Sequence, residues 1–445
     1  MKKFLASIIA VVLAVSGLSV ISITANAATI FISGNYEYTV NSDDTVNIAG
    51  YKGIATDITI PSQILNKNVV KISDNSFYNN STLTSVKIPN TIKVVGSMAF
   101  HNCTKLSKVT LPSNLTEIGY NAFEGTTALT TITIPKTVTT AGNNVFNGSA
   151  LKTAAIENGA TAVADNLFSN AKNLTKVTIP NTVKKVGSMS FYDCEKLSSV
   201  TLPNTLTEIG YSAFNGTTAL TTITIPKTVT KAGIDVFENS GLKTATIENG
   251  ATAVADNLFS NAKNLTKVTI PNTVKKVGSM SFYDCEKLSS VTLPNTLTEI
   301  GYSAFNGTTA LTTITIPKTV TKAGIDVFEN SGLKTATIEN GATAVADNLF
   351  SNAKNLTKVT IPNTVKKVGS MSFYDCEKLS SVTLPNTLTE IGYSAFNGTT
   401  ALTTITIPKT VTKAGIDVFE NSGLKTATIE NGATAVADNL FSNAK

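Results

Sequence analysis

The amino-acid sequence predicts a repeat solenoid, a single parallel stack of short β-strands joined by short helical or irregular outer segments. Three observations lead to this fold class. A 91-residue segment recurs, each copy divides into units of 22 or 23 residues, and one phenylalanine stands at the same place in successive units. A fixed period of this length is typical of stacked repeats, in which each unit contacts only its neighbours.

The composition of the 445 residues limits the functions open to the chain. It contains no Trp, one His and no Arg, and its formal charge is +6. Removal of Lys2 and Lys3 with a leader segment leaves 34 Lys against 30 acids, a net charge of +4. Phosphate recognition needs clustered positive charge and base reading relies on Arg, so we expect no nucleic-acid partner. The 42% hydrophobic content is sufficient for a buried core.

The first 27 residues have the pattern of a signal peptide. Met1-Lys2-Lys3 precedes an apolar run from Phe4 to Val20, and the small residues Ala25-Asn26-Ala27 follow. The run is short for a bilayer crossing, which takes about 20 apolar residues, and no later stretch is apolar enough. We therefore predict cleavage after Ala27, a secreted or cell-surface protein, and no membrane span after the signal is removed.

Long repeats account for most of the remaining chain. Residues 180–270 recur unchanged as 271–361 and again from 362 to 445, where the copy is incomplete, and an older copy, 89–179, differs at 18 positions. We expect residues 28–59, which are strand-rich, to form an N-terminal lead-in or cap, and residues 60–445 to form the solenoid. Solenoids need a polar cap at each end. Lys445 ends the chain where earlier copies continue, so we expect a continuation or a frayed last turn.

The spacing within one unit assigns an inward and an outward side. Val177 and Ile179 are two residues apart and point to one side of a strand, whereas Lys176 and Thr178 point to the other. All 13 prolines directly follow an inward Ile or Leu. Because Pro has no N–H group, it ends the strand at that point.

The phenylalanine column is the strongest evidence for a common core. Of 19 Phe residues, 17 recur at intervals of 22 or 23 residues from Phe77 to Phe441. An aromatic box for a cofactor is the alternative interpretation, but a buried spine explains every unit, so we expect no cofactor. The predicted core includes Phe191, Phe214, Phe237, Phe259, Phe282, Ile179 and Ile225.

The segments between strands allow two further predictions. Residues 188–194 and 253–262 are expected to form short helical turns on the outer side. Gly187, Gly210 and Gly233 share one position, where we expect backbone angles that other residues resist.

A resemblance to a known family follows from these residues. The spacing F-x-x-C-x-x-L-x-x-V-x-L-P-x-x-L-x-x-I-G, from Phe191 to Gly210, resembles the BspA-like leucine-rich repeats of bacterial surface proteins. The resemblance covers residues 36–445 and about 17 units. It implies a leucine-rich repeat solenoid and an exported adhesion or recognition protein, and it brings no catalytic residues.

The reactive residues give little support for a catalytic or metal-binding function. Cys103, Cys194, Cys285 and Cys376 are 91 residues apart. Four turns of about 4.8 Å separate neighbouring thiols by roughly 19 Å, too far for a disulfide or a shared metal. His101 has no counterpart in later copies, where Tyr stands instead. We expect no catalytic residue and no metal site.

The outward strand positions are the predicted binding face, on the concave side of the solenoid. Strand preference of Thr explains the same pattern equally well. The residues are Thr178, Thr201, Thr222, Thr224, Thr244, Thr246, Thr269, Lys176 and Lys267.

The leading functional hypothesis is a non-catalytic, multivalent binding or adhesion scaffold. Its partner would be an extracellular protein or glycan, held by avidity because the copies are identical. Two alternatives remain: an extracellular carbohydrate-active enzyme, and an ice- or crystal-surface binder that uses the Thr-x-Thr pairs.

Overall fold

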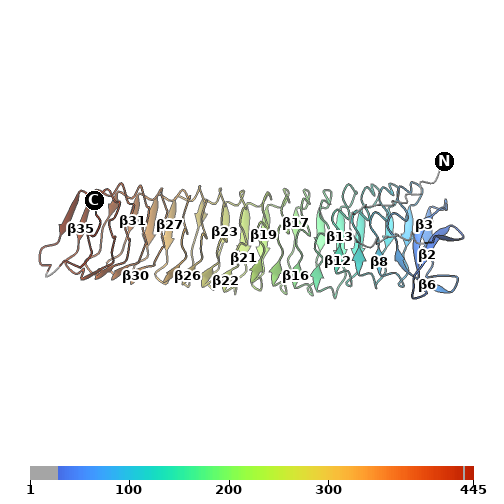
Figure 1. Cartoon of the computed structure of the whole chain (residues 1–445), viewed down its shortest axis with the longest axis horizontal. Coiled ribbons are helices and arrows are strands. Elements are labelled where there is room, and N and C mark those ends of the chain that lie inside the picture. The colour runs from blue at the N-terminus through green and yellow to red at the C-terminus, as the bar shows by residue number, and fades with distance from the viewer. Residues whose placement is uncertain (1–28, 434–435, 445) are drawn as a thin grey trace, which may run out of the picture.

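The chain forms one continuous stack of turns, as the sequence predicted (Figure 1). This computed structural model describes residues 29–433 and 436–444, and the predicted signal peptide, residues 1–27, lies outside them. The N-terminal and C-terminal ends of the described chain lie at opposite ends of the stack. Within the described ranges every regular element is a β-strand.

Seventeen strands in the described residues, which we call the long strands, carry the inward Val and Ile. Consecutive long strands that are paired run parallel, with each residue opposite its counterpart one unit later. They are β4 (Asp57–Thr59), β7 (Ser85–Lys87), β9 (Lys108–Thr110), β11 (Thr131–Ile134), β13 (Thr153–Ile156), β15 (Lys176–Thr178), β17 (Ser199–Val200), β19 (Thr222–Ile225), β21 (Thr244–Ile247), β23 (Lys267–Thr269), β25 (Ser290–Val291), β27 (Thr313–Ile316), β29 (Thr335–Ile338), β31 (Lys358–Thr360), β33 (Ser381–Val382), β35 (Thr404–Ile407) and β37 (Thr426–Ile429).

A second series, the short strands, runs along another side of the stack. Each short strand has two residues, one of which points into the core. They are β8 (Val94–Val95), β10 (Glu117–Ile118), β12 (Thr140–Ala141), β14 (Ala162–Val163), β16 (Lys185–Val186), β18 (Glu208–Ile209), β20 (Lys231–Ala232), β22 (Ala253–Val254), β24 (Lys276–Val277), β26 (Glu299–Ile300), β28 (Lys322–Ala323), β30 (Ala344–Val345), β32 (Lys367–Val368), β34 (Glu390–Ile391) and β36 (Lys413–Ala414).

The phenylalanines form a ladder through the centre of the stack. Rings of consecutive turns stack with centroids between 4.9 Å and 5.9 Å apart, from Phe77 to Phe441. The five core phenylalanines named above, Phe191 to Phe282, are 0% exposed. Ile225 is also buried, and Ile179 lies at the margin of the core, 9% exposed.

The outer segments contain no helix within the described residues, so the predicted helical turns at 188–194 and 253–262 were wrong. Met189 and Asp193 have positive φ angles, 52° and 51°, which interrupt a helix. The Phe191 N–H donates to the Ala213 carbonyl of the next turn, 2.9 Å away. The backbone groups of these segments therefore pair between turns, and a helix would have satisfied them within one turn.

The shared glycine position has a different cause from the predicted one. Gly187, Gly210 and Gly233 do not have positive φ angles. A Cβ atom on Gly210 would lie 2.4 Å from the backbone nitrogen of Ser188, in the preceding turn. Close approach of two backbones, and not an unusual φ angle, accounts for glycine here.

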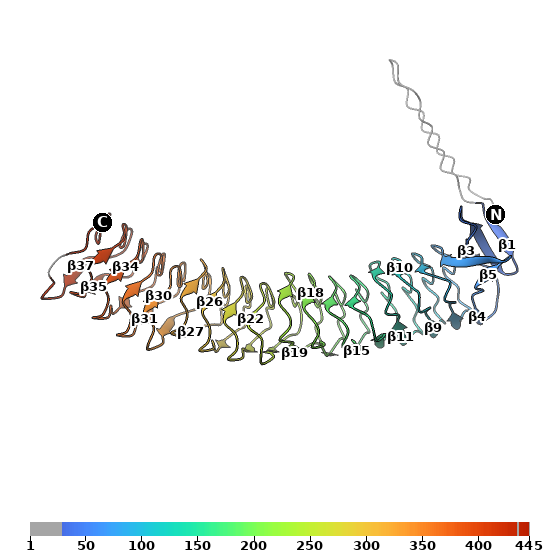
Figure 2. The same ribbon diagram turned by 90° about the horizontal axis from the view of Figure 1, so that it is seen from below.

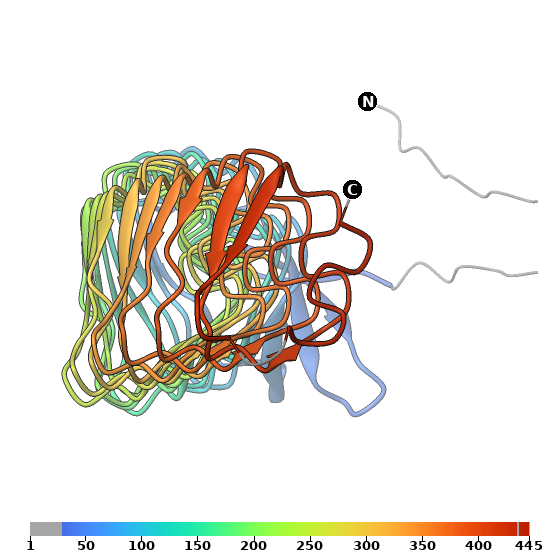
Figure 3. The same cartoon turned by 90° about the vertical axis from the view of Figure 1, so that its left-hand side faces the viewer.

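The stack bows gently, and the long strands lie on the outer side of the bow. Figure 2 shows β15, β19 and β27 along the outer edge, with β18 and β26 nearer the inner edge. The view along the stack in Figure 3 shows the same arrangement. The predicted concave placement of the long-strand face was therefore wrong. That prediction rested on where solenoids usually bind extended partners. The outer segments here are turns that hydrogen-bond from one unit to the next.

Six strands surround the first turn. β1, β2 and β3 form an antiparallel sheet, and β3 pairs in parallel with β6, which continues the short-strand series into β8. The Tyr51 ring lies 5.5 Å from the Phe77 ring and extends the aromatic ladder at this end. Besides β4, these strands are β1 (Phe31–Ser33), β2 (Tyr36–Val40), β3 (Val46–Tyr51), β5 (Gln63–Ile64) and β6 (Lys67–Ile72).

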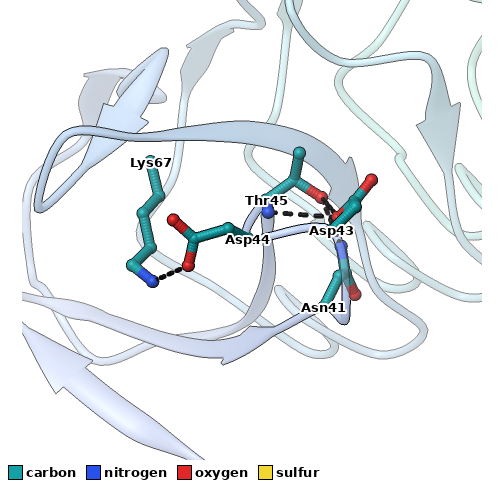
Figure 4. Close-up of polar contacts among 5 residues, drawn as sticks. All are labelled: Asn41, Asp43, Asp44, Thr45 and Lys67. Atoms are coloured by element: carbon teal, nitrogen blue, oxygen red, sulfur yellow. Dashed lines mark hydrogen bonds and ion pairs between the residues drawn. The ribbon is translucent and has the colours of Figure 1, made fainter.

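The turn between β2 and β3 is held by polar side chains (Figure 4). The Thr45 N–H and hydroxyl donate to Asp43 Oδ1 at 3.1 Å and 2.6 Å, and these hydrogen bonds lower the pKa of the Asp43 carboxyl. The Lys67 ammonium contacts the Asp44 carboxylate. The ion pair joins the hairpin to β6.

Candidate binding surface

The nine predicted binding residues lie on one surface, and all are exposed. Strand pairing sets them side by side: Thr222 is opposite Thr244, and Thr244 is opposite Lys267. We call the outward side of the long strands the long-strand face.

Two rows run along this face. The threonine row contains Thr178, Thr201, Thr224, Thr246 and Thr269, and continues to Thr428. The lysine-bearing row contains Lys176, Ser199, Thr222, Thr244 and Lys267, after which the same order repeats. Along one strand, the two rows are two residues apart, about 7 Å.

The hydroxyl groups of the threonine row are free to contact a ligand. In the described residues, no protein group forms a hydrogen bond with the hydroxyl of Thr201, Thr224 or Thr246. Other exposed threonines differ, because the Thr175 and Thr207 hydroxyls donate to carbonyl groups of the preceding turn at 2.9 Å and 3.1 Å. The contrast follows from position, because outward side chains of a strand point away from the backbone carbonyls that the flanking hydroxyls can reach.

The long-strand sheet is interrupted once in each 91-residue repeat. In the described chain, β17 and β19 belong to separate sheets, as do β9 and β11, β25 and β27, and β33 and β35. The Glu248 N–H donates to the Ile225 carbonyl at 3.0 Å and extends the β19–β21 pairing. Pro226, one turn earlier, has no N–H and cannot form the equivalent bond to Leu202.

A shallow hollow lies at each of the four interruptions. Their volumes are about 550, 670, 550 and 470 Å³ in chain order. The second hollow is lined by hydroxyl groups from both sheets and by one carboxylate at its rim. Its polar lining includes Ser198, Ser199, Thr201, Asn204, Thr222, Thr224, Thr244, Thr246 and Glu248.

The rim glutamates were missed by the sequence analysis. Glu248 Oε2 accepts a hydrogen bond from the Lys227 backbone N–H at 3.2 Å, and Glu157 accepts one from Lys136 at 3.0 Å. Glu339 and Glu430 repeat the contact. The sequence contained a pattern that could have identified them. In each 91-residue repeat, one of the four units has Glu where the other three have Pro.

The cysteines are buried in the core. The Cys194 thiol donates to the Phe168 carbonyl at 3.1 Å, and burial raises its pKa. Burial also raises the pKa of Cys103, to about 12. Thiols in this state are poor nucleophiles, because the thiolate is the reactive form.

His101 stacks on Tyr78, with ring centroids 4.9 Å apart, and its Nδ1 lies 3.2 Å from Glu124 Oε2. It lies away from the long-strand face, in an outer segment. Among the described residues, no three His, Cys, Asp or Glu side chains gather in a group that could hold a metal ion. The same part of the chain contains no helix with the length and apolar character needed to cross a membrane.

Comparisons with known proteins give a consistent result. A family model described as BspA type leucine rich repeat region matches residues 56–174, 161–285, 252–377 and 324–445. A solved leucine-rich repeat protein from Bacteroides ovatus is 26% identical with a TM-score of 0.50, and the match covers 88% of this chain and 92% of that one.

Two further solved structures are similar. A leucine rich cell surface protein from Faecalibacterium prausnitzii is 29% identical, with a TM-score of 0.39 and coverage of 76% of this chain and 96% of that one. A leucine-rich repeat protein from Eubacterium ventriosum is 26% identical, with a TM-score of 0.42 and coverage of 93% and 99%. No curated protein matched the chain.

Proposed function

Because the chain belongs to the BspA-type leucine-rich repeat family, we propose that it is a non-catalytic binding scaffold that acts outside the cell. The long-strand face is its binding surface. The observation that supports this proposal is the repetition of one hollow, lined by free hydroxyl groups, in each 91-residue repeat.

Repetition makes the scaffold multivalent. A partner long enough to contact two hollows binds more tightly than one that contacts a single hollow. The second contact needs no new kind of interaction, because the first contact raises the local concentration of the second site. The distance between equivalent hollows is four turns, about 19 Å. The partner is an extended extracellular protein or glycan.

The signal sequence supports export. Residues 1–27 have the order of charged, apolar and small residues that signal peptidases recognise. Expression of the full chain in a bacterial host should release a protein whose first residue is Ala28, as intact mass spectrometry would show. A first residue of Met1 on the released protein would contradict cleavage.

Deletion of one repeat tests the binding proposal. Removal of residues 271–361 joins Ile270 to Pro362 and preserves the local sequence, because Pro271 occupies the same place. We expect the shortened protein to keep its circular dichroism spectrum and to bind immobilised matrix proteins or polysaccharides with a faster dissociation rate. Equal dissociation rates for the full and the shortened protein would exclude multivalent binding.

Neither alternative function is favoured by a specific observation. A flat grid of Thr-x-Thr pairs suits an ice surface, but Lys176 and Lys267 interrupt the grid and the hollows break its plane. An enzyme needs an oriented set of acid, base or nucleophile. The only carboxylate in the second hollow, Glu248, accepts a backbone hydrogen bond at the rim.

A further inference from the structure

Lysine pairs stand at fixed intervals along the long-strand face. The first lysine of each pair occupies the flanking position one residue before its strand, and the second lies in the lysine-bearing row. In each pair, two lysines lie on adjacent turns, because the backbone N–H of the second donates to the carbonyl of the first at 3.2 to 3.3 Å. All six lysines are exposed. The lysine pairs are Lys152 with Lys176, Lys243 with Lys267, and Lys334 with Lys358.

The positive charge of these pairs is not compensated by the protein. Among the residues that the structure describes, no carboxylate lies within ion-pair distance of any of the six ammonium groups. Some lysines elsewhere are paired: Lys185 lies 3.1 Å from Glu208, and Lys172 lies 2.7 Å from Glu195. The lysine pairs therefore present uncompensated positive charge to a ligand on this side of the stack.

Neutral hydroxyl groups fill the interval between one pair and the next. Between Lys176 and Lys267, the lysine-bearing row presents Ser199, Thr222 and Thr244 beside the unbonded hydroxyls of the threonine row. Glu248 is four residues from Thr244 along the strand, about 13 Å away, at the other rim of the hollow. It does not neutralise the lysine pairs.

We propose that the long-strand face binds an acidic polysaccharide that lies parallel to the axis of the stack. Its anionic groups contact the lysine pairs, and its sugar hydroxyls exchange hydrogen bonds with the Ser and Thr side chains between them. This inference rests on the proposed function, and it adds the chemical class of the partner. Charge complementarity identifies the occupant, since positive sites about 19 Å apart alternate with neutral polar stretches.

Nucleic acid and acidic peptide fit this surface less well. A DNA strand has no free hydroxyl groups along its sugar-phosphate backbone to pair with the unbonded threonines. A polyglutamate chain has no hydroxyl groups to pair with the unbonded threonines. Both polymers serve as comparison probes.

The test uses residues 28–445 and two variants with the same net charge. In the test variant, all six lysines of the pairs are changed to Gln. In the control variant, six exposed lysines that lie in the short strands or directly before them are changed to Gln: Lys184, Lys231, Lys275, Lys322, Lys366 and Lys413. Binding of heparin, hyaluronan, neutral dextran, polyglutamate and single-stranded DNA is measured from about 50 mM to about 200 mM NaCl.

We expect the unmodified protein to bind heparin or hyaluronan and not dextran. The test variant should bind the acidic polysaccharide at least about tenfold more weakly, with a smaller dependence on salt, and the control variant should bind it nearly unchanged. Heparin binding without hyaluronan binding would assign the anionic group as sulfate, and the reverse would assign it as carboxylate. A Thr246→Val, Thr337→Val variant should also weaken polysaccharide binding but leave any polyglutamate binding unchanged.

Three outcomes would overturn the proposal. Equal losses in the test and control variants would show an effect of net charge alone. Equal or tighter binding of polyglutamate or DNA would show that hydroxyl groups do not contribute. Absence of polysaccharide binding would exclude this partner, and the repeat-deletion experiment with matrix proteins would then decide separately whether the proposed function stands. If the variant with six substitutions fails to fold, two double variants give the same comparison. The test variant then carries Lys243→Gln and Lys267→Gln, and the control variant carries Lys184→Gln and Lys231→Gln.

Discussion

Phe282 stacks on Phe305, with ring centroids 5.1 Å apart and ring planes 10° from parallel. The equivalent pair one repeat earlier, Phe191 and Phe214, has a separation of 5.2 Å and an angle of 9°. Each ring lies between the rings of the preceding and following turns, so the ladder links neighbouring turns throughout the stack. Its contribution to stability is large because the rings are fully buried.

Truncation of one ring should therefore destabilise the stack. We expect Phe282→Ala to lower the free energy of unfolding by about 3 to 5 kcal/mol, from lost burial and the cavity left behind. Urea denaturation followed by circular dichroism measures the change. The matched control is Tyr302→Ala, an aromatic side chain that is 46% exposed, for which we expect about 0.5 kcal/mol or less. A loss under about 1 kcal/mol for Phe282→Ala would contradict the buried ladder.

Two buried serines should respond in opposite directions to alanine. The Ser281 hydroxyl is buried without a hydrogen-bond partner, whereas the Ser331 hydroxyl donates to the Phe328 carbonyl at 2.6 Å. We expect Ser281→Ala to raise the free energy of unfolding by about 1 kcal/mol and Ser331→Ala to lower it by about 1 kcal/mol. Ala99 already occupies the equivalent position in the oldest repeat. Destabilisation by Ser281→Ala would indicate that its hydroxyl has a partner.

The Cys103 thiol should make stability fall at high pH. Burial raises the pKa of Cys103 from 9.0 to about 12, so above pH 9 the unfolded chain releases this proton and the folded chain retains it. Ionisation then favours the unfolded state, and the stability present below pH 9 is lost progressively up to about pH 12. The difference in free energy of unfolding between Cys103→Ala and the unmodified protein should shift by about 2 kcal/mol in favour of the variant between about pH 8 and pH 10.5. Urea denaturation at the two pH values measures this difference, and a constant difference would contradict it.

Removal of a rim glutamate should expose one backbone amide to exchange. Glu157 accepts a hydrogen bond from the Lys136 N–H, and Glu157→Ala leaves that group without its partner. We expect faster hydrogen exchange at Lys136, measured by mass spectrometry of a peptide that includes Thr140, which distinguishes the first repeat from the others. The equivalent amides of the later repeats, which Glu248, Glu339 and Glu430 contact, are the internal control. Unchanged exchange at Lys136 would show that the contact does not protect the amide.

The core of the fold was predictable because it depends on period alone. One Phe at 22 or 23 residue intervals, and two inward positions separated by one residue, define a stack of turns without knowledge of the chain between them. The outer segments were not predictable in this way. Met189 and Asp193 adopt positive φ angles, although neither residue favours that region as glycine does, because their neighbours hydrogen-bond to the next turn. Contacts between turns outweigh local preference here.

The outward position of the proposed binding residues could be predicted, but the shape of their surface could not. Alternation along a strand was sufficient to place Thr222 and Thr224 on the outward side. The hollows depend on where the pairing of neighbouring strands is interrupted, which involves residues about 23 positions apart. Glu248 follows β21, one turn beyond the interruption between β17 and β19, and its role became clear from its contact with the preceding turn.

The exact repetition of the interior has a consequence for the size of the molecule. Phe168 and Phe191 stack across the junction of two repeats at 5.6 Å, and Phe259 and Phe282 stack across the next junction at 5.6 Å. An added or lost copy therefore creates no new kind of contact. The length of the solenoid can therefore change in steps of about 19 Å while the contacts between neighbouring turns stay the same.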